Sequence, residues 1–167
     1  MIKSWLVIGV VTLLVALASN VLRPKDVKWF FRLRRPRWLV FEPLIPIIWT
    51  TIFICGAWSA YIVWEATKSW GLMAFYLAVE VAVVLYPPTT LWTHSLKAGT
   101  LVGGIGFLLG LILTLVVRPI SGWAALLLVP YLLWSPIGTY TTWAMDKINQ
   151  DMTRDGADTG DRDSTRV

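Results

Sequence analysis

Charged residues and cysteine are both scarce in this chain. Charged side chains make up 15% of the 167 residues, and Cys55, within an apolar stretch, is the single cysteine. One cysteine excludes an internal disulfide and a metal cluster built on cysteines. The sequence also lacks an HExxH zinc motif, a phosphate-binding loop and a Ser-His-Asp set with usable spacing. We therefore expect no metal site and no catalytic residues of these kinds.

Apolar residues are abundant instead. Hydrophobic residues make up 56% of the chain, the mean hydropathy is +0.64, and 11 residues are tryptophan. These values lie far from those of soluble globular proteins. At about 20 residues for each spanning helix, the length accommodates five helices. We predict an all-α membrane protein, a five-transmembrane-helix bundle with a long first loop in one domain over residues 1–146, with helices at about 4–22, 43–64, 71–92, 99–117 and 122–143.

The two ends of the chain differ from the rest. Lys3, the apolar core after it and Ala16-Leu17-Ala18 also resemble a secretory signal peptide with a small-residue cleavage site. Nineteen residues is long for such a core, so we favour retention as the first membrane helix. Residues 147–167 interleave aspartates with arginines and glycines, which predicts a polar disordered tail.

Positive charge is concentrated in the first loop. Seven of the 15 lysines and arginines lie between Arg23 and Arg37. Such a strip beside a helix end is typical of a topology signal and of lipid headgroup contact, so we expect the bilayer and no nucleic acid as partner. With five spans, twelve lysines and arginines fall on the side of this loop and three on the other. The positive-inside rule then places the N-terminus outside and the first loop and C-terminus in the cytoplasm, and favours an inner or plasma membrane.

Prolines and glycines predict a bend and close packing. The pair Pro87-Pro88 removes two backbone donors, which predicts a kink near one membrane face. Four glycines of the fourth predicted helix share one face and allow another helix to approach closely; they are Gly99, Gly103, Gly106 and Gly110. This face serves either packing inside the bundle or a seam with a second copy, and we expect a homodimer.

Three motifs occur in a characteristic order. They are WFFRLRRPRW at 29–38, after the first span, Tyr86-Pro87-Pro88 in the third, and PYLLW at 130–134 in the fifth. In order and spacing they resemble the translocator protein family, TspO/MBR, of tryptophan-rich sensory proteins, over nearly the whole chain except the tail. The resemblance implies a five-helix bundle with a cavity that opens toward the first loop. It also implies binding of porphyrins or haem, and some members bind sterols.

The resemblance further implies which residues line the cavity. By position, Trp49, Tyr86 and Trp134 match aromatic residues of the family, and Gly138 occupies a position where the family usually has alanine. Thr142 replaces an asparagine found in many members. Val83 likewise stands where many members have asparagine. Because fewer amide hydrogen bonds are available, the set of ligands is expected to differ.

The fifth predicted helix supports such a site by its own spacing. Trp134, Gly138 and Thr142 follow one another at intervals of four, and Tyr131 precedes them by three, so they share a helix face. Indole faces stack on a conjugated macrocycle, and each aromatic contact adds roughly 0.5–1.5 kcal/mol. The alternative is that the tryptophans are interfacial anchors or packing residues, which suits those near helix ends. The predicted ligand-binding residues are Trp49, Phe53, Tyr86, Tyr131, Trp134, Gly138 and Thr142.

The first loop is predicted to fold over the cavity mouth as a lid. Its aromatic residues give it an apolar face, and its arginines have two interpretations. They either meet the propionates of a porphyrin through charge-assisted hydrogen bonds or contact anionic headgroups. The predicted lid residues are Trp29, Phe30, Arg35 and Trp38.

Two polar residues are additional candidates. Glu80 lies mid-way along the third predicted helix, where a carboxyl is either functional or bonded to a partner inside the bundle. His94 lies near the predicted membrane surface. It either ligates haem from a pocket-facing position or is a solvated loop histidine.

Three functional hypotheses follow. The favoured one is an integral membrane protein that binds porphyrin or haem as its ligand, requires no cofactor, and acts in sensing, transport or disposal. The second is an enzyme that degrades porphyrin oxidatively beside Trp49 and Trp134. The third is a sterol-binding, lipid-binding or scaffold protein, and the scaffold predicts no saturable quenching of tryptophan fluorescence by protoporphyrin.

Overall fold

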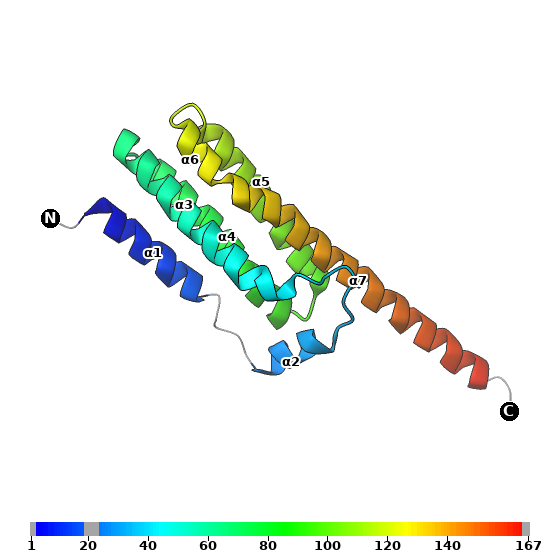
Figure 1. The fold of residues 1–167 in the computed structure, drawn as a ribbon. Coiled ribbons are helices and arrows are strands. Elements are labelled where there is room, and N and C mark those ends of the chain that lie inside the picture. The colour runs from blue at the N-terminus through cyan, green and yellow to red at the C-terminus, as the bar shows by residue number, and fades with distance from the viewer. Residues whose placement is uncertain (1–2, 19–23, 165–167) are drawn as a thin grey trace.

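The chain folds into long helices that lie side by side (Figure 1). The structure, a computed structural model, describes residues 3–18 and 24–164, with side chains up to residue 150, and these ranges contain no strand. The all-α prediction is confirmed. In chain order the elements are α1 (Ser4–Ala18), α2 (Pro24–Arg32), the 3-10 turn η1 (Glu42–Leu44), α3 (Ile45–Thr67), α4 (Trp70–Trp92), α5 (Leu96–Val117), α6 (Gly122–Leu127) and α7 (Val129–Ser164).

Among the residues that the structure describes, four stretches are long and apolar enough to cross a membrane, rather than the five predicted. They are Glu42–Thr67, Trp70–Trp92, Leu96–Val117 and Gly122–Gln150. The described part of the first predicted span, α1, has 15 residues and therefore a length of about 22 Å at 1.5 Å per residue. A hydrocarbon core is about 30 Å thick. The predicted end of this span, residues 19–22, lies outside the described residues.

Serine residues begin three of the helices. The hydroxyls of Ser69, Ser95 and Ser121 accept hydrogen bonds from the backbone N–H three residues further on, at the starts of α4, α5 and α6. Each hydroxyl satisfies one of the backbone donors that a helix start leaves without a partner. These caps explain why the connections between the apolar runs are so short.

The last predicted span consists of two helices, which corrects the continuous helix at 122–143. α6 ends at Leu127 and α7 begins at Val129, with Leu128 between them. Pro130 explains the break, because proline has no N–H to donate and its ring clashes with the carbonyl four residues earlier. The pair Pro87-Pro88, in contrast, lies inside α4, which continues through it as one helix.

The tail differs from the disordered segment that was predicted after residue 146. α7 continues as helix to Ser164 and extends beyond the other helices (Figure 1). A helix already formed adds one hydrogen bond for each residue it fixes, whereas a new helix must first form a costly nucleus. The packed part of α7 supplies that nucleus for the polar residues after it.

The four glycines of α5 are used inside the molecule. A Cβ at Gly99 would lie 2.1 Å from the Thr90 hydroxyl, and a Cβ at Gly110 would lie 2.2 Å from the Tyr131 ring. Gly103 and Gly106 face Thr139 and the Tyr131 hydroxyl in the same way. Of the two interpretations of this glycine face, the structure therefore supports packing of α5 against α4 and α7.

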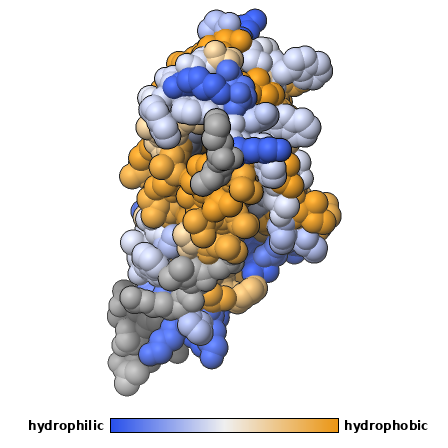
Figure 2. All heavy atoms as spheres, turned by 90° about the vertical axis from the view of Figure 1, so that its left-hand side faces the viewer, coloured by the Kyte–Doolittle hydropathy of each residue, from blue (hydrophilic) through white to orange (hydrophobic). Residues whose placement is uncertain are grey.

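Apolar side chains cover much of the outer surface. On the face that Figure 2 shows, hydrophobic residues form a broad central band and hydrophilic residues gather toward the two ends. Exposed leucines, valines and tryptophans occur on α1 and on α3 to α7. Such a band is what a lipid environment requires and what a water-soluble surface avoids.

Candidate ligand-binding cavity

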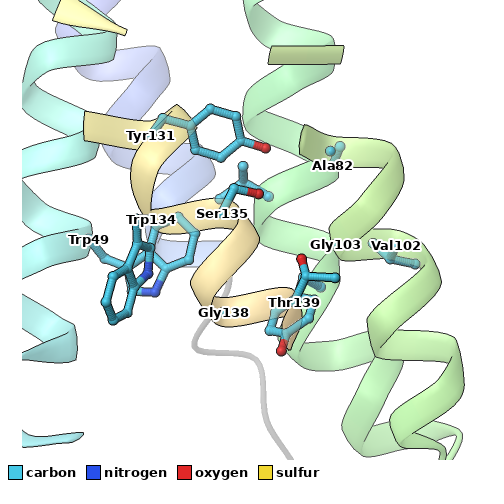
Figure 3. Close-up of a pocket in the computed structure, with 12 residues that line it drawn as sticks. Trp49, Ala82, Val102, Gly103, Tyr131, Trp134, Ser135, Gly138 and Thr139 are labelled. Atoms are coloured by element: carbon cyan, nitrogen blue, oxygen red, sulfur yellow. The ribbon is translucent and has the colours of Figure 1, made fainter. Parts of the chain in front are cut away.

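Two tryptophans from different helices line one internal cavity. Trp49 of α3 and Trp134 of α7 form part of its wall (Figure 3), and both are half-buried. Tyr86, Tyr131 and Gly138, three other candidate residues from the sequence, also line it. The cavity lies between α3, α4, α5 and α7, so it is inside the bundle and not on its lipid face. The remaining lining residues are Ala82, Val83, Val102, Gly103, Gly106, Ser135 and Thr139.

The α7 face offers the gap that the spacing predicted. A Cβ built at Gly138 meets no atom within 4 Å, whereas the Tyr131 ring is buried and fills the space above Gly106 and Gly110. Figure 3 shows Tyr131 directed toward α5 and Trp134 directed toward Trp49. The cavity wall is therefore open at Gly138, whereas the Tyr131 ring closes it beside Gly106 and Gly110.

Two predicted residues lie beside the cavity and not in its wall. Thr142 is buried, and its hydroxyl donates a hydrogen bond to the Gly138 carbonyl. Because a hydroxyl has a single proton, Thr142 accepts the second hydrogen bond, which the Tyr86 hydroxyl donates. This contact joins α4 to α7. Phe53 contacts the Trp49 ring at a centroid distance of 6.3 Å. Thr142 and Phe53 therefore support two side chains that line the cavity, Tyr86 and Trp49.

The first loop packs against α7 through stacked aromatic rings. Trp38 stacks on Tyr140 with ring centroids 5.8 Å apart, and the edge of Phe41 contacts Trp134 at 5.8 Å. Phe41 was not among the predicted lid residues, although it is the aromatic residue through which the loop contacts the cavity wall. Its place just before α3 was the signal that could have identified it.

Polar contacts also attach the loop to the bundle. The Arg34 N–H donates to Asn149 Oδ1 at 3.1 Å, and Asn149 Nδ2 donates to the Arg34 carbonyl at 3.2 Å. Arg35 forms an ion pair of 2.8 Å with Glu42, and its guanidinium lies 5.3 Å from the Phe31 ring centre and 6.0 Å from that of Phe30. Arg35 thus organises the loop itself.

Three predicted residues are located elsewhere. Glu80 lines a different pocket, between α1, α3 and α4. His94 lies 3.3 Å from the carboxylate of Asp26, and its ring meets the edge of Trp29 at 4.9 Å, at the loop end of the bundle. The structure therefore brings neither Glu80 nor His94 into the tryptophan cavity, and Trp29 contacts His94 rather than a cavity residue.

The cavity matches a tetrapyrrole in chemistry but not in size. Aromatic faces and a glycine gap suit a flat conjugated ring. The cavity volume, however, is about 30 Å³, which is room for about one water, whereas pockets that bury a drug-sized ligand measure roughly 300–1,000 Å³. A macrocycle can enter only if the loop and the tryptophans move apart.

The fold and the cavity define a helical membrane protein with an aromatic-walled internal site. The family model of the TspO/MBR family matches residues 6–148. The chain belongs to this family, and it is an integral membrane protein. The resemblance that the motifs indicated is confirmed.

Curated relatives cover most of the chain. It is 28% identical to the uncharacterized membrane protein YtaB of Bacillus subtilis, over 86% of this chain and 95% of the relative. It is 27% identical to the tryptophan-rich protein TspO of Bacillus cereus, over 88% and 97%. The tryptophan-rich sensory protein of Cereibacter sphaeroides is 23% identical, over 80% and 84%.

Proposed function

We propose that this protein binds a porphyrin or haem between Trp49 and Trp134 and acts in the sensing, transport or disposal of tetrapyrroles. The observation that carries the proposal is the convergence of two indoles from α3 and α7 on one cavity beside the open position at Gly138. Helices in a membrane do not need tryptophan to face lipid or to pack on one another, because aliphatic and small side chains suffice for both. A flat aromatic ligand gives these indoles a role.

Ligand entry proceeds through the loop end. The contact between Phe41 and Trp134 couples the loop to the cavity wall, so displacement of the loop frees one face of that indole. The arginines at 32–37 belong to this loop, and a cationic loop attracts the propionates of the ligand.

A fluorescence titration tests this proposal. Protein reconstituted in detergent is titrated with protoporphyrin, and we expect saturable quenching of tryptophan emission with a stoichiometry of one ligand per chain. A flat but uncharged aromatic hydrocarbon and an unrelated membrane protein serve as controls. Quenching that rises linearly without saturation, or equally in the unrelated protein, would reject a specific site.

We further propose that α1 is a fifth span and that the chain forms a homodimer. Residues 4–22 contain no charged side chain, and 19 residues are long enough to cross a bilayer as a helix. This topology places the N-terminus outside and the loop and C-terminus in the cytoplasm. A dimer interface must use a face other than the α5 glycines, and light scattering in detergent measures whether the mass is that of two chains.

A further inference from the structure

A second pocket lies between α1, α3 and α4. Its volume is about 520 Å³, within the roughly 300–1,000 Å³ typical of sites for small organic molecules. It shares no lining residue with the tryptophan cavity. This pocket of ligand size is therefore on the opposite side of α3 and α4 from the proposed tetrapyrrole site.

The pocket is long, apolar and aromatic at one end. Trp64 and Trp70 meet edge to face with ring centroids 4.9 Å apart, where α3 ends and α4 begins. Glu80 lies ten residues after Trp70 on α4, a distance of about 15 Å at 1.5 Å per residue. Between these ends the wall consists mainly of aliphatic side chains, among them Val7, Val11, Met73 and Leu77. The shape suits an extended hydrocarbon of about that length.

Glu80 gives the inner end of the pocket a single acidic group. The Thr12 hydroxyl donates to Glu80 Oε1 at 2.7 Å. No ion pair among the described residues includes Glu80. An ionisable side chain inside a membrane is costly unless it is partnered, and it marks functional sites. One hydrogen bond from a neutral hydroxyl leaves the carboxyl able to accept from a cationic donor.

We propose that this pocket binds an apolar amine, with the hydrocarbon along α1 and α4 and the nitrogen at Glu80. An ammonium group would form a charge-assisted hydrogen bond with the carboxyl, and such bonds are about twice as strong as neutral ones. A fatty acid would bring a second acidic group against Glu80, and a sugar or polyol would leave hydroxyls unpaired against the aliphatic wall. An apolar amine therefore fits both parts of the pocket, because its hydrocarbon packs on the aliphatic wall and its nitrogen bonds the Glu80 carboxyl.

Photolabelling in nanodiscs tests the proposal. The full chain is reconstituted in zwitterionic phosphatidylcholine, so that no anionic lipid attracts the probe, and labelled with dodecylamine that carries a diazirine. We expect saturable labelling of peptides from residues 4–18 and 70–80. Dodecylamine should compete with the label, and dodecanol and dodecanoic acid should compete at least tenfold less well.

Two variants assign the effect to the pocket. Glu80→Gln keeps the size of the side chain and should weaken labelling at least tenfold, whereas Glu42→Gln, which changes a carboxyl paired with Arg35 outside the pocket, should leave it unchanged. Ala74→Phe narrows the pocket without altering the carboxyl and should also abolish labelling. Circular dichroism melting shows which variants are folded, and Ala74→Phe provides the test if Glu80→Gln is not.

Several results would overturn the proposal. Equal competition by dodecanol would show that the carboxyl does not select an amine. Equal labelling of folded Glu80→Gln, or of folded Ala74→Phe, would place the amine outside the pocket. Labelling that never saturates would mean that the probe is only dissolved in the lipid around α1.

Discussion

Gly138 is open toward the cavity, since a Cβ built there meets nothing within 4 Å. We predict that Gly138→Val keeps the stability of the protein but weakens protoporphyrin binding about tenfold, because the two methyl groups occupy the space beside Trp134. Fluorescence titration measures the affinity and thermal unfolding measures the stability. Gly104→Val is the matched control, because Gly104 is equally open but does not line the cavity. Equal affinities in both variants would contradict the site.

The tryptophans of α3 differ in position and should differ in function. Trp49 lines the cavity, whereas Trp58 is 60% exposed on the same helix. We predict that Trp49→Leu and Trp134→Leu each weaken protoporphyrin binding about two- to tenfold, which corresponds to roughly 0.5–1.5 kcal/mol of aromatic contact. Trp58→Leu should bind like the parent protein. If all three variants lost affinity equally, the effect would come from general destabilisation, and the two-indole site would be wrong.

At the scale of helices, the packing of α5 against α7 depends on the glycines of α5. A Cβ at Gly110 would lie 2.2 Å from Tyr131 Cε1, so the ring must shift. We predict that Gly110→Ala lowers the free energy of unfolding by about 1–3 kcal/mol, as overpacking does in well-packed cores. Gly104→Ala should be neutral or stabilising, because alanine favours a helix over glycine. Thermal unfolding in detergent distinguishes the two, and an equal loss of stability in both variants would show that the close approach of Gly110 to Tyr131 is not what limits packing.

The loop is attached to α7 through Asn149. We predict that Asn149→Ala, which removes both hydrogen bonds to Arg34, makes protoporphyrin associate faster and makes residues 33–41 more sensitive to protease. Gln150→Ala is the control, since Gln150 bonds Asp146 on its own helix. Stopped-flow quenching gives the association rate. An unchanged rate, with the loop nevertheless cleaved faster, would mean that the loop does not limit entry.

The elements were largely predictable from sequence, and their ends were not. The apolar runs predicted α3, α4 and α5 to within three residues at each end, and Pro43 marked the start of the first of them. The start of α5 was placed three residues late because the cap at Ser95 was not used. The break at Leu128 was missed because Pro130 was taken as a tolerated residue within a long apolar run. The helical tail was missed because composition describes an isolated segment and not one attached to a packed helix.

The candidate site was also only partly predictable, because the sequence shows which residues share a helix face but not which helices are neighbours. Spacing on one helix face indicated that Trp134 and Gly138 lie together, and both line the cavity. It could not place Phe41 or Thr139, because their roles depend on which helices are neighbours. Glu80 was recognised as costly in a membrane, but only the structure showed that it faces a second pocket beneath α1.

Topology is a prediction for the whole molecule. If α1 and residues 19–22 together cross the bilayer, reporters fused to the two ends should lie on opposite sides of the membrane. A pH-sensitive fluorescent protein at each terminus in turn measures this in intact cells. We expect the C-terminal reporter in the cytoplasm and the N-terminal one outside. Two cytoplasmic reporters would leave four spans and place α1 along the membrane surface.

A small polar cluster joins three helices at the end away from the loop. Ser59 is fully buried, and its hydroxyl donates to the Ala124 carbonyl at 2.7 Å. Because that hydroxyl has one proton, it accepts the 2.6 Å hydrogen bond that the Tyr76 hydroxyl donates. Breaking this cluster would leave buried polar groups unpaired. α3, α4 and α6 are therefore held together at one end, while the first loop closes the other through contacts that water or lipid can replace. Any widening that admits a large ligand should grow with distance from Ser59, so that the molecule opens as a wedge and not as a uniformly swollen cylinder.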